Sequence, residues 1–246
     1  MKKDEIARVL DAMRSELSSY LTRFVIRPEL AEELVQETAL RALQHLERAP
    51  DSVDEYRPWL FRIATNLAID ARRKQSFRRE HLMETLRGTA KANAEFVART
   101  RPLIGTPEMR SIAKEHLAFC LRCAVHNVSG PQAAALLLKA FHGLSNRDIA
   151  DVLAIAPAQV KNRLQEARGV LRAHYGTTCA LITQEGACFQ CKELDGYYQA
   201  GGGNPLSGTA GDVEARLNIG RVFDPAQPTR WQSMLLELVN QLDGVQ

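Results

Sequence analysis

The chain has 246 residues, of which 45% are hydrophobic and 25% are charged, and its formal net charge is +3. This ordinary globular balance excludes a wholly disordered chain, and the length allows one large domain or two small ones. No apolar run reaches the roughly 20 residues that a membrane helix needs, and no signal-peptide pattern opens the chain, so we expect a cytoplasmic protein. Up to about residue 175, apolar residues recur at spacings of three and four, which predicts helices.

The first predicted unit, residues 1–80, contains an acidic helix. Residues 29–37 (ELAEELVQE) hold four Glu and no basic residue. A helix that contacted the phosphates of DNA would not carry this charge, because the phosphates are themselves negative. The segment therefore favours a protein partner.

A strong helix is predicted for residues 58–75, with Pro58 at its first position, where a missing N–H costs nothing. Its expected core face consists of Leu60, Ile63, Ala64, Leu67 and Ala71. A second, mostly polar face consists of Trp59, Arg62, Asn66, Asp70 and Arg73. An aromatic ring, an amide and arginines suit a separated DNA strand, since they can stack on bases, bond to base edges and neutralise phosphates. The alternative is a solvated face with Trp59 packed at the helix start.

The polar face leads into a basic run and then into a predicted linker. Residues 72–79 (RRKQSFRR) hold five basic residues and no acidic one. Residues 81–112 show little periodicity and contain two Gly and two Pro, which indicates a linker.

In the second predicted unit, residues 113–176, an early helix contains Cys120 and Cys123 on neighbouring faces, where the two thiols could bind one ion.

The end of the second unit has the layout of a helix-turn-helix. Gly143 ends one helix, and Ser145 with Asp148 forms a capping pair for a short helix. A tight break at Ala154 follows, and Pro157 begins the next helix.

The helix after the break has a buried stripe and a basic face. The stripe consists of Val160, Leu164, Ala167 and Leu171. The opposite face consists of Gln159, Lys161, Asn162, Arg163 and Arg168. Such side chains near the start of a second helix can reach base edges and phosphates in a major groove. The alternative is a helical hairpin with a solvated basic face.

Residues 177–246 differ in composition from the rest of the chain. They begin with Cys179, Cys188 and Cys191, the last two as a second C-x2-C pair, and a Gly-rich stretch follows. A terminal amphipathic helix is predicted for residues 229–243. Two C-x2-C pairs match the ligand set of a structural zinc site.

Three segments in this order resemble the extracytoplasmic-function (ECF, group IV) sigma factors of the sigma-70 family. They are AEELVQETALRALQHLER, YRPWLFRIATNLAIDARRK and LSNRDIADVLAIAPAQVKNRLQEAR. The resemblance covers about residues 10–175 and implies an all-α fold of two small domains. These are a sigma2-like helix bundle in residues 1–80 and a sigma4-like helix-turn-helix domain in 113–176, joined by the linker 81–112. A Cys-containing C-terminal extension, residues 177–246, follows them.

The resemblance also implies binding roles for particular residues. Those expected to dock on the clamp helices of the largest subunit of RNA polymerase core are Glu33, Leu34, Gln36 and Glu37. Those expected to contact the −10 promoter element are Tyr56, Trp59, Arg62, Asn66, Asp70, Arg72, Arg73 and Lys74. Those expected to contact the −35 element are Gln159, Lys161, Asn162, Arg163 and Arg168. One departure is Ala154, where family members usually have Gly; the usual Gly-Thr is also replaced, by Ala158 and Gln159.

A subset of these sigma factors has similar cysteine pairs before and after the helix-turn-helix. This likeness implies a shared site, and we expect one structural zinc held by Cys120, Cys123, Cys188 and Cys191. The alternatives are buried core thiols and a reversible disulfide switch, and Cys179 is either spare or a substitute ligand.

No phosphate loop, Ser-His-Asp spacing or His-Glu metal motif is seen, so we expect no enzymatic activity. The expected partners are core polymerase and promoter DNA, with an anti-sigma factor as a further candidate and no membrane. Two other functions stay open. One is a helix-turn-helix regulator that acts without polymerase, which leaves the acidic helix unexplained. The other is a metal- or redox-sensing interaction protein.

Overall fold

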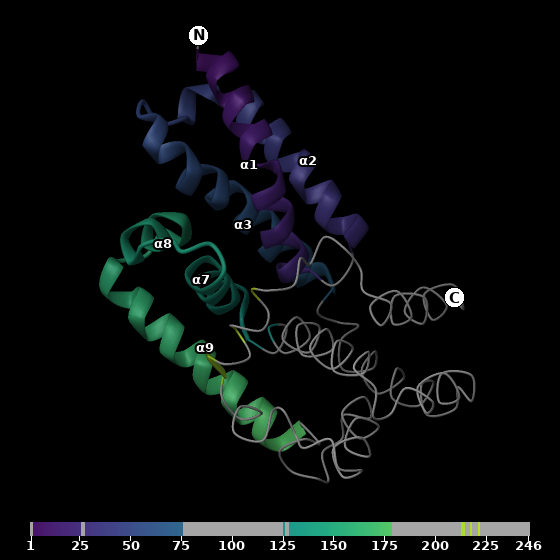
Figure 1. The fold of residues 1–246 in the computed structure, drawn as a ribbon, viewed down its shortest axis with the longest axis vertical. Helices are drawn as coiled ribbons and strands as arrows, with labels where there is room; N and C mark the ends of the chain where they lie inside the picture. Colours follow the sequence, from purple (N-terminus) through teal and green to yellow (C-terminus); the bar gives the residue numbers. More distant parts are fainter. Residues whose placement is uncertain are drawn as a thin grey trace, which may run out of the picture. The chain divides into compact units, whose positions relative to one another are not determined.

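The computed structural model describes residues 2–25, 28–75, 125, 128–178, 213, 214, 217 and 221 (Figure 1). Every regular element in these ranges is a helix, which confirms the predicted all-α fold class. The chain divides into two compact units, the first of which consists of Met1–Gln75, Val128–Arg168 and Asp224–Ala226. The predicted linker lies outside the described residues, as does nearly all of the C-terminal extension, so the predicted domain boundaries stay predictions.

Three helices form the first part of this unit. Helix α1 (Lys2–Phe24) packs against α2 (Pro28–Gln44) and α3 (Tyr56–Gln75), and Figure 1 shows the three side by side. Two short 3-10 turns, η1 (Leu46–Arg48) and η2 (Val53–Glu55), connect α2 to α3. Helix α1 is amphipathic, with buried residues at spacings of three and four, as a core-facing stripe requires. These residues are Ile6, Leu10, Met13, Leu17, Tyr20, Leu21 and Phe24.

Helix α3 begins two residues earlier than predicted, at Tyr56 instead of Pro58. The backbone N–H groups of the first turn have no partner within a helix, so proline is tolerated anywhere in that turn. The predicted core face is also slightly rotated. Phe61 and Ala68 are buried, whereas Ile63 and Ala71 are half-buried.

The second part of the unit consists of α7 (Gly130–Ala140), α8 (Asn146–Leu153) and the part of α9 (Pro157–Thr178) that ends at Arg168. Helix α8 begins with a capping box, in which the hydroxyl of Ser145 accepts a bond from the Asp148 amide and the Asp148 carboxylate accepts one from the Ser145 amide. This confirms the predicted capping pair. The predicted stripe of α9 is confirmed as well, because its four members, Val160, Leu164, Ala167 and Leu171, are all buried.

The turn between α8 and α9 depends on one left-handed residue. Ala154 has φ 52° and ψ 46°, and the amide of Ile155 donates to the carbonyl of Ala150 at 3.1 Å. This backbone geometry is the one that commonly ends a helix, and glycine is the residue that adopts it without a steric penalty. The chain therefore keeps the turn with a residue that is less suited to it.

We expect Ala154→Gly to stabilise the protein by about 1 kcal/mol, because the substitution removes the Cβ clash of a left-handed residue. The midpoint of urea unfolding followed by circular dichroism measures the change. Ala12→Gly, at an exposed position inside α1, provides the control and should destabilise by a similar amount. A loss of stability in Ala154→Gly would contradict this account of the turn.

Candidate nucleic-acid interface

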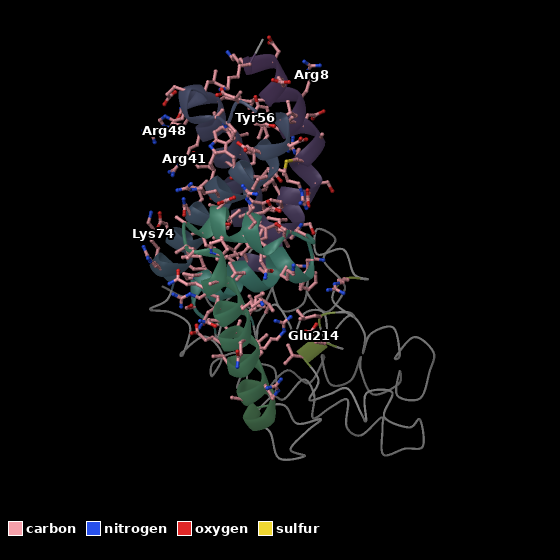
Figure 2. All side chains as sticks on the ribbon, turned by 90° about the vertical axis from the view of Figure 1, so that its left-hand side faces the viewer. Arg8, Arg41, Arg48, Tyr56, Lys74 and Glu214 are labelled. Carbon is pink, nitrogen blue, oxygen red and sulfur yellow. The ribbon has the colours of Figure 1, made fainter. Side chains whose placement is uncertain are left out.

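The predicted polar face of α3 points outward in the structure. Arg62, Asn66, Asp70, Arg73 and Lys74 are exposed, and Figure 2 shows Lys74 projecting at the end of the helix. An exposed ion pair joins Asp70 to Arg73 at 3.4 Å. Trp59 is half-buried, with its ring centroid 6.4 Å from that of Tyr56. The helix thus presents an amide, a carboxylate, three basic groups and a half-buried indole on one side.

Two residues predicted to contact DNA are instead buried. Tyr56 is 1% exposed, and its hydroxyl donates to a carboxylate oxygen of Glu5 at 3.3 Å. Arg72 is 4% exposed, and its Nη2 donates to the carbonyl of Val128 at 2.8 Å. In this arrangement neither side chain can reach a nucleic acid. The spacing of residues on a helix does not reveal this, since both side chains find partners that are distant in sequence.

The acidic helix α2 presents most of its predicted binding face. Glu33 and Gln36 are exposed, and the carboxylate of Glu37 accepts a bond from Arg41 at 2.7 Å. Leu34, predicted to contact a partner, is instead 7% exposed and belongs to the core, because it lies on the inner side of the helix.

One residue of α2 was missed by the sequence analysis. Leu40 is 53% exposed and lies three and four positions after Glu37 and Gln36, on the same face. A large apolar side chain that stays in water beside an acidic face is a candidate interface anchor. Its position one helical turn after Gln36 and Glu37 could have identified it from the sequence.

The predicted basic face of α9 is accessible at the start of the helix. Gln159, Lys161 and Asn162 are exposed, and the Gln159 side chain accepts a bond from the Ala156 amide at 3.1 Å. Arg163 is half-buried and pairs with Glu166 at 3.3 Å. Arg168, also half-buried, lies one and a half turns further along. The first turns of α9 therefore present polar and basic groups, as a helix in a major groove does.

The predicted metal ligands, Cys120, Cys123, Cys188 and Cys191, lie outside the described residues, as does Cys179. Within the part of the chain that is described, no three His, Cys, Asp or Glu side chains gather as a metal site would need. Among the described helices, none is long and apolar enough to span a membrane.

A polar cluster of the half-buried Glu16 and Arg57 with the buried side chain of His142 joins the two parts of the first unit. Arg57 of α3 donates to the carboxylate of Glu16 in α1, with Nε at 3.2 Å, and to the carbonyl of His142 at 2.6 Å. The ring of His142 lies after α7, with Nδ1 3.2 Å from Glu16 and its side chain 4% exposed. Among the described residues, its Nε2 has no hydrogen-bond partner.

The cluster determines how these groups ionise. Burial lowers the pKa of His142 below its ordinary value of 6.5, although the Glu16 carboxylate partly opposes this. Burial would raise the pKa of Glu16, but hydrogen bonds from His142 and Arg57 outweigh it and lower that pKa to about 2. At neutral pH the cluster therefore holds a neutral imidazole, a carboxylate and a guanidinium.

We expect acidification below pH 6.5 to destabilise the first unit. Below that pH, His142 takes up a proton in the unfolded chain more readily than in the folded chain, where its pKa is lowered. The free energy of unfolding therefore has its full value above the pKa of His142 in the unfolded chain and decreases as the pH falls. The pH dependence of the urea midpoint between pH 7.5 and 5.5 measures this effect, with a limit of about 1.4 kcal/mol per pH unit for one proton. Below pH 4.5, protonation of Glu16 should add to the loss.

His142→Gln should make the urea midpoint depend less on pH between pH 7.5 and 5.5. His45→Gln is the matched control, because His45 also lies beside a carboxylate, 3.3 Å from Glu47, but its side chain is 46% exposed. Equal slopes in His142→Gln and the unaltered protein would show that another group controls the effect.

Known proteins match both groups of helices. The model of Sigma-70 region 2 matches residues 9–78, which include α2 and α3, and that of Sigma-70 region 4 matches residues 118–171, which include α7 and α8. The chain is 32% identical over 170 residues to the ECF RNA polymerase sigma factor SigL of Mycobacterium tuberculosis (strain H37Rv). That alignment covers 68% of this chain and 88% of SigL.

Two further relatives are more distant. RNA polymerase sigma factor SigZ of Bacillus subtilis is 24% identical over 164 residues, which cover 66% of this chain and 82% of SigZ. The ECF RNA polymerase sigma-E factor of Haemophilus influenzae is 27% identical over 158 residues, which cover 64% of this chain and 80% of that factor.

Proposed function

Because this chain belongs to the family of ECF RNA polymerase sigma factors, we propose that its two matched segments divide promoter recognition between them. Promoter recognition with RNA polymerase is the function of the family, whose members in general are not enzymes. The observation that carries the division of roles is the exposure of two different polar surfaces, one on α3 and one at the start of α9. The catalysis then belongs to core polymerase, and this chain supplies the DNA contacts, in the cytoplasm.

We assign the opened −10 element to α3. Arg62 and Asn66 lie at the centre of its exposed face, where they can donate to base edges, while Arg73 and Lys74 follow at the end of the helix. The half-buried indole of Trp59 lies one turn before Arg62, within reach of an unstacked base. Tyr56 would act indirectly, by anchoring the start of the helix.

We assign the −35 element to α9. Lys161 and Asn162 are exposed in its first two turns, and Arg163 follows beside them. Residues at this position of a recognition helix contact base edges in the major groove, which presents a distinct pattern for each base pair.

We assign the docking of core polymerase to α2. Glu33, Gln36 and Glu37 form its polar surface, and the exposed Leu40 adds an apolar group at one end. A patch of this composition, charged at its edge and apolar where it is desolvated, is typical of a protein–protein interface.

We expect Glu33→Lys combined with Glu37→Lys to abolish core binding, because charge reversal turns attraction to a basic partner into repulsion. Affinity for core polymerase, measured by fluorescence anisotropy, is the readout. Asp11→Lys with Glu47→Lys makes the same change of net charge at other exposed sites and should bind normally. Unchanged affinity of the first variant would remove α2 from the interface.

We expect Asn66→Ala to weaken binding of a single-stranded −10 oligonucleotide, and Arg163→Ala to weaken binding of a duplex −35 fragment. Each loss should be about 1–3 kcal/mol, the value of one good base-edge contact. Both probes are taken from genomic promoters. These promoters are first identified by run-off transcription with the complex of this chain and core polymerase. The assignment is wrong if both variants weaken duplex binding alike and leave single-strand binding intact.

We further propose that Cys120, Cys123, Cys188 and Cys191 hold one structural zinc ion. Their two C-x2-C pairs support this, since four thiolates form a closed tetrahedral site. Elemental analysis of purified reduced protein should find about one zinc ion per chain, and Cys188→Ser with Cys191→Ser should lose it. Zinc-free unaltered protein would exclude the site. An anti-sigma factor as a further partner stays an untested prediction.

A further inference from the structure

The carboxylate of Glu166 lies on α9 beside a basic side chain that we assign to the −35 element. Its Oε2 is 3.3 Å from Nη1 of Arg163, one helical turn earlier. The same oxygen accepts a bond from the side-chain amide of Gln132, 34 positions earlier in the chain, at 3.0 Å. We propose that Glu166 and Gln132 are positioning residues, which hold the guanidinium of Arg163 in the orientation that reads one base pair of the −35 element. The inference rests on the proposed function, because that function assigns Arg163 to DNA.

Gln132 is itself fixed by the cap of α7. Its Oε1 accepts a bond from the Ser129 amide at 3.0 Å, and its backbone amide donates to the Ser129 hydroxyl at 3.4 Å. The amide side chain has an acceptor oxygen and a donor nitrogen, so the bond from Ser129 to the oxygen leaves the nitrogen to donate to Glu166. Rotation of the amide by half a turn would break both bonds. Gln132 therefore has one orientation, and that orientation fixes the carboxylate of Glu166.

The ion pair between Arg163 and Glu166 is too exposed to contribute much to stability. The two side chains are 42% and 49% exposed. Exposed pairs add little to the free energy of unfolding, because water screens the attraction and both side chains lose freedom. A carboxylate beside a DNA-binding arginine also repels phosphates, which lowers the affinity for DNA of any sequence. The favourable effect of Glu166 is therefore expected on selectivity.

Orientation of the guanidinium can produce this selectivity. Arginine carries several N–H donors in a planar fork, and the Nη1 edge of Arg163 faces Glu166. The other edge can still donate to a base, for example to the two acceptors that guanine presents in the major groove. A mobile arginine side chain loses rotamer freedom when it binds. Because Glu166 restricts the side chain before binding, less freedom is lost at the correct base pair and fewer contacts are possible at an incorrect one.

The position of Glu166 fits a supporting role better than a base contact. Arg163 ends the second turn of α9, whereas Glu166 lies in the third. The residues of a recognition helix that contact base edges lie near its N-terminus. The Oε2 atom of Glu166 also has two donors within the protein already. A direct contact between Glu166 and a base is therefore the competing assignment, and the double variant below tests it.

Gln132→Glu separates positioning from capping. A glutamate at this position still accepts the bond from the Ser129 amide, as in other capping boxes, but it repels Glu166 instead of donating to it. We therefore expect the urea midpoint to stay nearly the same. The preference of the complex of full-length chain and core polymerase for an intact promoter over one with a scrambled −35 element should fall by about three- to tenfold, part of the value of one base contact. Fluorescence anisotropy with labelled promoter fragments measures this preference as the ratio of the two dissociation constants.

Gln165→Glu is the matched control for this substitution. It adds the same charge at the exposed position next to Glu166. The added charge repels phosphates regardless of sequence, so it should weaken binding of both fragments alike and leave the preference unchanged. An equal loss of preference in Gln132→Glu and Gln165→Glu would attribute the effect to charge and reject the positioning role.

Glu166→Ala tests the same role from the side of the carboxylate. Alanine is a good helix former, so the exposed part of α9 should fold normally. The variant should bind the scrambled promoter more tightly, because a negative charge is lost, yet its preference for the intact promoter should fall. Asp151→Ala removes an exposed carboxylate from α8 and should strengthen binding of both promoters alike. An unchanged preference in Glu166→Ala would reject the proposal.

Combined variants identify the residue through which Glu166 acts. In a chain with Arg163→Ala, adding Glu166→Ala should lower the preference no further, because the side chain to be positioned is gone. A further loss would indicate a direct base contact by Glu166 and overturn the inference. With single base-pair substitutions in the −35 element, Gln132→Glu and Arg163→Ala should both lose discrimination at the same base pair, and losses at different base pairs would also overturn it.

The same measurements distinguish this inference from the proposed function. Absence of any preference in the unaltered complex would reject the proposed function and the inference with it. A preference that Arg163→Ala leaves intact would remove that residue from the −35 contacts, and the positioning role with it. A preference that falls in Arg163→Ala but stays intact in Gln132→Glu and Glu166→Ala would reject the positioning role alone.

Discussion

The ring of Tyr20 lies at the point where the helices of the first unit meet. It is fully buried, with ring centroids 5.6 Å from Phe24 and 5.2 Å from Phe61, and its hydroxyl lies 2.8 Å from that of Thr65. Burial raises the pKa of Tyr20, so the hydroxyl keeps its proton and can donate. Because the Tyr20 ring packs edge-on and its hydroxyl needs a hydrogen-bond partner on α3, helix α3 is fixed in one rotation about its own axis relative to α1. That rotation determines which residues of α3 face outward.

The rotation gives the arginines of α3 different environments. Arg57 and Arg72 point toward the neighbouring helices, where carboxylate and carbonyl oxygens accept their bonds, whereas Arg62 and Arg73 point into solvent. Successive residues of a helix differ by about 100°, so positions one apart can face different partners. One side of α3 therefore packs against other helices of the unit, while Arg62, Asn66 and Arg73 stay exposed on another side.

The helix-turn-helix is organised differently, by local interactions. Ser145 and Asp148 cap α8 reciprocally, Ala154 provides the left-handed turn, and Gln159 bonds back to the amide before α9. All these contacts join residues within a few positions of one another, so their formation does not depend on the rest of the fold. The orientation of the recognition helix is therefore set by the segment itself, while the position of the segment is set by His142 and its distant partners.

The sequence by itself determined the features whose causes are local. These include the helical class, the capping pair at Ser145, the turn at Ala154 and the buried stripe of α9, because periodicity and capping act over one or two turns. Only the tertiary structure decided that Leu34, Tyr56 and Arg72 point inward, since the partners of these side chains lie on other helices. The same holds for the Glu16–Arg57–His142 cluster, whose members are up to 126 positions apart. A helical pattern specifies which residues share a face, but the direction of that face follows from packing against elements that are distant in the chain.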